Sequence, residues 1–241
     1  YNLGIVLSAL EKWKEAIHAY TQTIRLRPDY FEALNNLGNI LREHSNTDSA
    51  IEIYNKALKL KPDCVEAWNN LGNVLKEQGQ IENAIENYKK AIQIKPDYAE
   101  AWNNLGSAMS AQNRFKDAIE HYRHALKLKP DYAEAWSNLG GVMEIIGEFN
   151  TSIESYRQAL KHKPDYNIAF SNLLYLLSYN VVCSPEQILE EHRNWGRIHE
   201  EKQKIHNFSH IKPTNPNKRL RIGYVSSDFR KHALSFFFEP I

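Results

Sequence analysis

Apolar and polar positions recur with a period of 34 residues from the start of the chain to about residue 166. Each period fits two helices, and a Pro-Asp pair ends the second helix, because proline cannot continue it. A helix pair of this size does not bury its apolar face alone, so neighbouring pairs must stack. The pattern predicts an all-α solenoid. The Pro-Asp pairs begin at Pro28, Pro62, Pro96, Pro130 and Pro164.

Other residues on the same period fit the packing of two helices against each other. A glycine and a small alanine or serine let the helices approach closely, and tyrosine with aliphatic residues fills the space between units. The Leu-Gly pairs begin at Leu3, Leu37, Leu71, Leu105 and Leu139. The small residues are Ala16, Ala50, Ala84, Ala118 and Ser152, and the tyrosines are Tyr20, Tyr54, Tyr88, Tyr122 and Tyr156.

Tryptophan opens three of the units, at Trp68, Trp102 and Trp136, with Leu34 at that position in an earlier one. The order Trp, Leu-Gly, Ala, aromatic residue, Pro resembles the tetratricopeptide repeat, a 34-residue helix–turn–helix unit. The resemblance implies a right-handed superhelix of five repeats, the first incomplete. Their boundaries are 1–30, 31–64, 65–98, 99–132 and 133–166.

Residues 167–206 are expected to cap the repeats and connect them to the C-terminal part of the chain. Phe170 stands at the Trp position of a further first helix, 167–180, but no second helix with a Pro-Asp pair comes after it. Ser184 and Gln187 predict a capping box at the start of a new helix. That helix is expected to be amphipathic and to end near residue 203. Its apolar face is set by Ile188, His192, Trp195 and His199. The two histidines lie two turns apart without a third ligand, which favours packing against the repeats over metal binding.

Asparagine occupies the sixth position of every unit. At 100° per residue, positions 2, 6, 9 and 13 of the first helix lie opposite the apolar positions 4, 7, 8 and 11. The sixth position holds Asn2, Asn36, Asn70, Asn104, Asn138 and Asn172. Because asparagine is a mediocre helix former, we expect an exposed carboxamide column that binds the backbone of an extended peptide. The alternative is that the repeats are copies of one ancestral unit that diverge slowly.

The second position of four units is acidic, with Glu32, Glu66, Glu100 and Glu134. This row is interpreted as a solvated helix face, with the guidance of basic partners as the alternative. Charge is otherwise balanced, with 30 Lys and Arg against 29 Asp and Glu and a net charge of +1. The balance argues against nucleic acid as a partner. No apolar run reaches the roughly 18 residues that cross a bilayer, so no membrane partner is expected.

Cysteine use points to a reducing compartment, and we expect a cytoplasmic protein. Cys64 and Cys183 belong to no motif, which disfavours a disulfide framework or a cysteine-based zinc site. No cofactor and no metal ligand set is expected from these residues. The chain starts without an initiator methionine and ends in an apolar stretch, and we expect it to be a piece of a longer protein.

The pattern changes after residue 206. Residues 207–218, with two prolines, are expected to be a linker. Alternating Leu220, Ile222 and Tyr224 then predict a short β-strand. Residues 226–229 (Ser-Ser-Asp-Phe) break it, and an apolar helix is expected from Ala233 to Glu239. A strand, a polar turn and a helix are how an α/β nucleotide-binding lobe begins, with ligands beyond the strand's carboxyl end. Residues 219–241 are therefore expected to open a truncated α/β domain.

The stretch from Arg219 to Phe229 (RLRIGYVSSDF), with His232 three residues on, resembles the start of the catalytic region of the O-linked N-acetylglucosamine transferase (SPINDLY-like) family. The connector helix resembles that of bacterial members. The asparagine column also matches this family, whose repeats hold acceptor peptides through such side chains. The loop departs from the animal pattern: Arg230 and Lys231 replace Gly-Asn, and Ala233 replaces Pro.

The resemblance implies a two-lobed inverting glycosyltransferase that moves a sugar from a nucleotide-sugar donor to Ser or Thr hydroxyls without a metal. It places His232 at the active site, where an imidazole can accept or share a proton near neutral pH. UDP-N-acetylglucosamine is the donor expected for the parent protein, with GDP-fucose as the rival. The donor-binding lobe lies outside these 241 residues, so the chain by itself is expected to be inactive.

The chain's expected partners are acceptor proteins bound in extended form, and a nucleotide sugar in the complete enzyme. A second hypothesis is a non-enzymatic repeat scaffold for protein–protein interaction, with an unrelated tail. A third is a clamp for C-terminal carboxylates. That clamp needs a basic groove, and the glutamate row disfavours it.

Overall fold

The computed structural model describes residues 1–44, 46–179 and 184–203, and in these residues all regular structure is helical. The expectation of an all-α solenoid is confirmed. In chain order the helices are α1 (Asn2–Ala9), α2 (Trp13–Leu26), α3 (Phe31–Glu43), α4 (Thr47–Leu60), α5 (Val65–Glu77), α6 (Ile81–Ile94), α7 (Ala99–Ala111), α8 (Phe115–Leu128), α9 (Ala133–Ile145), α10 (Phe149–His162), α11 (Asn167–Tyr179) and α12 (Pro185–Gln203).

Each of the first five helix pairs is closed by a tyrosine ring on a glycine. The five tyrosines of the second helices are at most 2% exposed. Each ring lies so close to the glycine of its own pair that a Cβ there would stand 2.6–2.9 Å from a ring atom. Only glycine leaves room for that approach. The alanine of the small position is fully buried in four pairs, and in the fifth Ser152 is buried and donates a 2.8 Å hydrogen bond to the carbonyl oxygen of Gly140.

The turn inside a pair requires a left-handed residue. Glu11, Gly79, Asn113 and Gly147 occupy the same unit position and have φ angles of 56°, 77°, 60° and 84°. Asparagine and glycine adopt this region readily, whereas glutamate does so at a cost. The chain thereby reverses within a few residues, and the second helix returns along the first.

The loop between pairs explains the recurring tryptophan. The indole Nε1 of Trp68 donates to the carbonyl oxygen of Pro62 at 2.8 Å, six residues back in the preceding unit. Trp102 and Trp136 repeat this bond at 2.8 and 2.9 Å. Each half-buried tryptophan therefore ties the start of its unit to the loop that precedes it.

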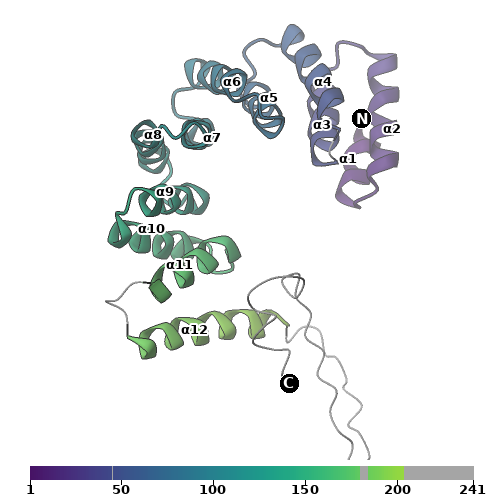
Figure 1. Cartoon of the computed structure of the whole chain (residues 1–241). Helices are drawn as coiled ribbons and strands as arrows, with labels where there is room; N and C mark the ends of the chain where they lie inside the picture. The colour runs from purple at the N-terminus through teal and green to yellow at the C-terminus, as the bar shows by residue number, and fades with distance from the viewer. Residues whose placement is uncertain (45, 180–183, 204–241) are drawn as a thin grey trace, which may run out of the picture. The chain divides into compact units, whose positions relative to one another are not determined.

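Successive pairs stack side by side, with the odd-numbered helices α1 to α11 along the inner side of the curve and α2 to α10 along the outer side (Figure 1). One hydrophobic core runs through the pairs from Ala16 to Met143. A second cluster holds residues of α10 and α11. Leu37, Leu71, Leu105 and Leu139 are 3–4% exposed, whereas Leu3 at the same position of the first unit is 63% exposed.

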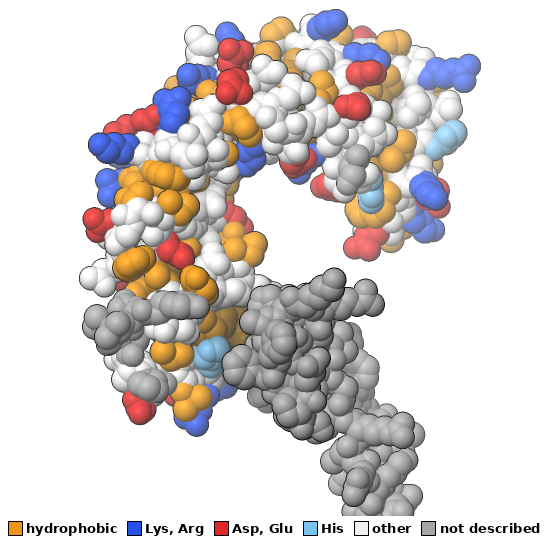
Figure 2. Space-filling model, in the orientation of Figure 1, with side chains coloured by type: hydrophobic (Ala, Val, Ile, Leu, Met, Phe, Trp, Pro, Cys, Tyr) orange, Lys and Arg blue, Asp and Glu red, His pale blue; other side chains and the backbone are white. Residues whose placement is uncertain are grey.

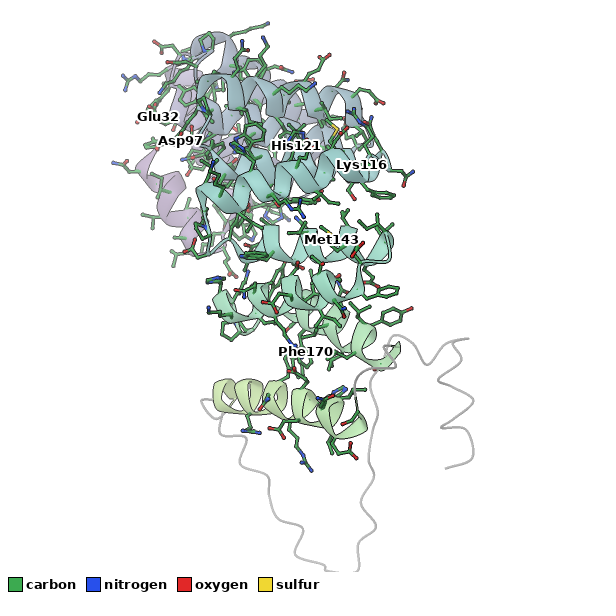
Figure 3. The ribbon with its side chains drawn as sticks, turned by 90° about the vertical axis from the view of Figure 1, so that its left-hand side faces the viewer. Glu32, Asp97, Lys116, His121, Met143 and Phe170 are labelled. Atoms are coloured by element: carbon green, nitrogen blue, oxygen red, sulfur yellow. The ribbon has the colours of Figure 1, made fainter. Side chains whose placement is uncertain are left out.

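The helix that comes after the repeats begins and ends as predicted. Ser184 Oγ accepts from the backbone N–H of Gln187 at 3.3 Å, and Gln187 Oε1 accepts from the backbone N–H of Ser184 at 2.9 Å. This reciprocal pair is a capping box. On α12, Trp195 stacks on Phe170 with ring centroids 4.8 Å apart, and His192 meets the same ring edge-on at 6.3 Å. Figure 3 shows Phe170 on the side of α11 that faces α12.

His192 thus packs against α11, the helix that comes directly after the last repeat. The side chain of His199 lies outside the described residues, as do the predicted linker 207–218, the predicted strand and turn of 219–229, and His232.

Candidate functional site

One side of the odd-numbered helices is left uncovered by helix packing. Positions 4, 7, 8 and 11 pack against the second helix of each pair, which places positions 2, 6, 9 and 13 on the opposite side. Because the even-numbered helices lie outside, this side looks inward along the curve (Figure 1). We name these positions the inner face. From α3 to α11 it comprises Glu32, Asn36, Asn39, Glu43, Glu66, Asn70, Asn73, Glu77, Glu100, Asn104, Ser107, Ala111, Glu134, Asn138, Gly141, Ile145, Ile168, Asn172 and Tyr175.

The asparagine column is less exposed than the sequence predicts. Asn2 is exposed, but the other five members are half-buried. Asn104 Nδ2 donates to Asn69 Oδ1 at 2.9 Å, and Asn138 Nδ2 donates to Asn103 Oδ1 at 2.9 Å. Each bond links the sixth position of one unit to the fifth position of the unit before. The expectation of a freely exposed column is therefore wrong in part, because the repeat brings consecutive inner helices close enough for their carboxamides to meet.

These hydrogen bonds from one unit to the next form a ladder of carboxamides. The residues that accept in this ladder are more deeply buried than those that donate. Asn69 and Asn103 are each 5% exposed. A carboxamide has two N–H donors and a carbonyl with two lone pairs, so a donor used on a neighbour leaves capacity for a ligand. The ladder both joins units and presents amides to the inner face.

The ladder shifts between the second and third units. Asn70 Nδ2 donates to Asn39 Oδ1 at 2.9 Å, and that oxygen also accepts from the hydroxyl of Tyr54 at 2.5 Å. Asn35 Oδ1, the oxygen that the pattern would use, is buried without a hydrogen-bond partner among the described residues. An unpaired buried acceptor is costly, so this junction is less well satisfied than its successors.

The glutamate row divides into two halves. Glu100 lies 3.5 Å from Lys129 Nζ, and Glu134 lies 2.9 Å from Lys163 Nζ. Burial alone raises the pKa of Glu134, but the hydrogen bond and charge of Lys163 outweigh it and hold the pKa below its usual value. Glu32 and Glu66 are exposed and belong to none of the ion pairs among residues 1–44, 46–179 and 184–203. Figure 2 shows acidic side chains on the inner rim near α1, α3 and α5.

Position 12, at the border of the inner face, adds two cations that sequence reasoning missed. Lys76 Nζ reaches across from α5 to donate to Ser107 Oγ of α7 at 3.0 Å, and burial lowers its pKa. Arg42 is half-buried, and its positive charge opposes the rise in pKa that burial causes at Tyr54 of its own unit and at Tyr88 of the next. The signal was in the 34-residue lattice, where position 12 reads Ser8, Arg42, Lys76, Ser110 and Glu144.

The C-terminal end of the inner face is apolar instead. Ile145, Ile168 and Tyr175 are 62%, 61% and 58% exposed. At its ninth and thirteenth positions, the inner face therefore runs from asparagine and glutamate on α3 and α5, through Ser107 and Ala111 on α7, to Ile145 on α9 and Tyr175 on α11.

Residues 1–44, 46–179 and 184–203 contain no group of three or more His, Cys, Asp or Glu side chains arranged to hold a metal ion. Among the same residues, no helix is long and apolar enough to cross a membrane.

Models of known families match the repeats one after another. Tetratricopeptide repeat models match residues 1–63, 53–86 and 133–166, and a TPR repeat model matches 72–112 and 110–144. No curated protein matches the chain in sequence.

Several solved structures share the fold. MamA is 24% identical with a TM-score of 0.61, over 69% of this chain and 98% of MamA. TTC0263, a thermophilic TPR protein of Thermus thermophilus, is 20% identical with a TM-score of 0.63, over 73% and 96% of the two chains. YrrB, described as a TPR protein with an unusual peptide-binding site, is 20% identical with a TM-score of 0.53, over 76% and 98%. At these identities the likeness shows the fold alone.

Proposed function

Because residues 1–166 of this chain are tetratricopeptide repeats, we propose that it binds an extended segment of a partner protein along its inner face. The observation that carries the proposal is the carboxamide ladder of α3 to α9. It places one half-buried amide at the same position of each successive unit. The similar fold of YrrB, a TPR protein with a peptide-binding site, supports the same use of the fold.

The chemistry suits a backbone ligand. An extended peptide presents alternating N–H and C=O groups, and a carboxamide can donate to one and accept from the other. A regular row of such groups contacts the ligand whatever its side chains are. The binding is expected to be weak for short ligands, since each residue of a flexible peptide that becomes ordered on binding loses conformational entropy.

Site-specific photocrosslinking tests this proposal. A crosslinking amino acid replaces Ala111, an exposed inner-face residue at the end of α7, or Glu86, an exposed residue of the outer helix α6. The protein is mixed with a labelled Ser/Thr-rich peptide of about 15 residues. We expect crosslinks from position 111 and few from position 86. Equal labelling at both positions, or no binding by fluorescence polarisation, would contradict the proposal.

A second, finer proposal concerns the parent protein. We propose that the repeats deliver acceptor proteins to a protein O-glycosyltransferase domain that begins near Arg219, with His232 at its active site. The resemblance of residues 219–229 to that family supports this proposal. These residues lie outside the part of the chain that the structure describes. The carboxamide ladder also suits an enzyme that accepts many sequences, because it would contact the backbone of the acceptor rather than its side chains.

The parent protein extended past Ile241 tests this proposal. It is incubated with a Ser/Thr-rich peptide and either UDP-N-acetylglucosamine or GDP-fucose, and the peptide mass is read. A gain with one donor would support the transferase and name the sugar, whereas no gain with either, from a folded protein that binds the peptide, would favour the scaffold. The 241-residue chain alone is expected to give no gain.

A further inference from the structure

A pocket of about 410 Å³ opens on the inner face where α1, α2 and α3 meet. Ile5, Trp13, Tyr20 and Ile40 supply its apolar and aromatic walls. Ser8, Asn36, Asn39 and Glu43 supply its polar part. The pocket therefore combines a space for an aliphatic stem with one carboxylate.

The walls of this pocket recur in the next unit. Four of them return 34 residues later with the same residue type, as Tyr54, Asn70, Asn73 and Glu77. The other four walls differ: Ile5, Ser8, Trp13 and Ile40 correspond to Asn39, Arg42, Thr47 and Val74. At position 12 of the unit before, the first junction therefore has Ser8 and the second has Arg42. The chain thus contains two versions of one junction, one with a small side chain and one with a guanidinium.

The structure shows where the longer side chain goes. Burial raises the pKa of Tyr54 and of Tyr88, and the positive charge of nearby Arg42 opposes that rise at both tyrosines. The charge of Arg42 therefore influences a tyrosine of its own unit and one of the next unit. At the next junction, Lys76 crosses from α5 to donate to Ser107 of α7 at 3.0 Å. Two consecutive junctions hold a cation of the chain itself.

None of the residues that line the pocket at the first junction is a cation, and the nearby His44 ring contacts Trp13 with the ring centroids 5.0 Å apart. Ser8 is short, and its hydroxyl donates to the carbonyl oxygen of Gly4 on its own helix at 2.8 Å. Asn39 Oδ1 already accepts from Tyr54 and Asn70. Glu43 is exposed and takes part in none of the ion pairs formed by the described part of the chain. Its carboxylate is free to accept from a ligand.

We propose that this pocket takes the side chain of an arginine in the bound partner segment, an inference that rests on the proposed function of the inner face. The arginine stem lies along Ile5 and Ile40, and its guanidinium meets Glu43. A guanidinium is planar and weakly hydrated, stacks on aromatic faces such as that of the half-buried Trp13, and pairs with a carboxylate through two parallel hydrogen bonds. Arginine is preferred to lysine for these reasons and because Arg42 occupies the matching junction.

The test uses the full 241-residue chain and a set of synthetic probes. These are N-acetyl-arginine amide and the capped peptide Gly-Ser-X-Ser-Gly, in which X is arginine, lysine or the neutral isostere citrulline. Binding is followed by calorimetry and by the indole N–H signals in NMR spectra. We expect the arginine peptide to bind at least tenfold tighter than the citrulline peptide, with lysine between them. The N-acetyl-arginine amide is expected to shift the Trp13 signal.

Variants locate the effect. Ser8→Arg places at position 12 of the first unit the arginine that the second unit has there. It is expected to reduce the preference for arginine over citrulline to less than twofold, with an unchanged or raised Tm. Ser110→Arg is the matched control, since it adds the same charge at position 12 of α7, where the next unit has Ile145 in place of the glutamate. It should keep the preference. Glu43→Gln should abolish it without affecting the citrulline peptide.

The outcomes separate this inference from the proposed function. If all peptides bind equally, the inner face binds peptides but the arginine pocket is refuted. An arginine preference that survives Ser8→Arg or Glu43→Gln would also refute the pocket. If neither these peptides nor the Ser/Thr-rich peptide of about 15 residues binds while the N-acetyl-arginine amide still shifts Trp13, the pocket stands and the proposed peptide-binding function fails.

Discussion

The interior of the helix pairs and the inner face obey the same 34-residue period but vary in opposite ways. Inside the pairs, every unit has the same glycine under the same tyrosine, and the ring contacts differ by only a few tenths of an ångström. On the inner face, the second, ninth and thirteenth positions change from glutamate and asparagine to isoleucine and tyrosine along the chain. Close packing inside the pairs allows only one combination of residue types, whereas solvent-facing positions can vary without destabilising the stacked helices.

The sixth position belongs to both regions. Its asparagines lie on the inner face, yet two of them, Asn104 and Asn138, donate to oxygens of residues that are only 5% exposed. Their repetition therefore has a structural cause as well as any role in binding. The two explanations open at the level of sequence, peptide binding and slow divergence from one ancestral unit, stay predictions, since a bridging carboxamide still has a second donor for a ligand.

The largest expected effect is loss of the fold at alkaline pH. Burial raises the pKa of Tyr54, Tyr88, Tyr122 and Tyr156 far above the ordinary value and raises that of Tyr98 to about 12. A pKa raised in the folded state gives stability that is complete below the unfolded pKa of about 10 and is lost as pH rises toward the folded pKa. The helices should therefore melt between about pH 10 and 12.

Absorbance of tyrosinate at 295 nm and helical circular dichroism, recorded on the same pH series, check this expectation. The two signals should change together in one steep step. Complete ionisation with the helices intact would mean that the tyrosine interior is not as closed as the structure shows.

Two adjacent glycines test the interior against its surroundings. A Cβ at Gly140 would stand 2.9 Å from the ring of Tyr156, whereas a Cβ at Gly141 would meet only the Tyr156 hydroxyl at 3.6 Å. Gly140→Ala is expected to destabilise by about 1–3 kcal/mol through overpacking. Gly141→Ala is expected to stabilise by up to about 1 kcal/mol through helix propensity. Thermal unfolding of the pair measures the difference, and equal effects would contradict the ring-on-glycine packing.

The dual role of the asparagines predicts a smaller effect. Asn138→Ala removes the donor to Asn103 Oδ1 and leaves that buried oxygen unpaired, at an expected cost of about 1–3 kcal/mol. Asn2→Ala, at the same unit position but exposed, should change stability by less than about 0.5 kcal/mol. Urea unfolding of both variants makes the comparison. If the two variants were equally stable, the column would be a surface feature, and the ladder would add nothing to the fold.

The smallest effect is expected at the glutamate row. Lys163→Met removes the partner that lowers the pKa of Glu134. A lowered pKa gives stability above the ordinary value of about 4.5 that is lost as pH falls. Because both side chains are more than 40% exposed, the loss at pH 7 should stay below about 0.5 kcal/mol. It should vanish near pH 3.

Lys95→Met is the matched control for that variant. Lys95 occupies the same unit position and lies over Tyr98 as Lys163 lies over Tyr166. It forms no ion pair with Glu66 among the described residues. Stability curves of the two variants between pH 3 and 7 should differ only above about pH 4. Identical curves would mean that the ion pair contributes nothing.

The architecture could be predicted from the sequence because the same residue types recur at the same positions of every repeat. The 34-residue spacing of Pro28 and its successors, the Leu-Gly pairs and the tyrosines predicted the helix pairs and their order. The capping box of Ser184 and Gln187 predicted where α12 begins, since a cap is a contact between residues three apart and needs no tertiary information. The strand, the linker and His232 remain predictions, as they lie outside the described residues.

The candidate site was only half visible in the sequence. The face that holds the asparagines followed from helical geometry, but their partners did not. The contact from Asn138 to Asn103 joins residues 35 apart on different helices, and the angle between successive pairs decides whether they meet. Arg42 and Lys76 escaped notice because position 12 varies between units, and a search for repetition overlooks positions that differ.

By itself, the sequence determined that this chain is a stack of helix pairs, which residues close each pair, and which side of the first helices stays uncovered. These properties depend on residues within one unit, so a single repeat already contains them. Only the tertiary structure decided which amides bond across units, which glutamates are paired, and where a pocket opens beside Ser8. Those properties depend on how one unit is placed on the next, and that placement is a balance of many side-chain contacts between neighbours rather than a feature of any one unit.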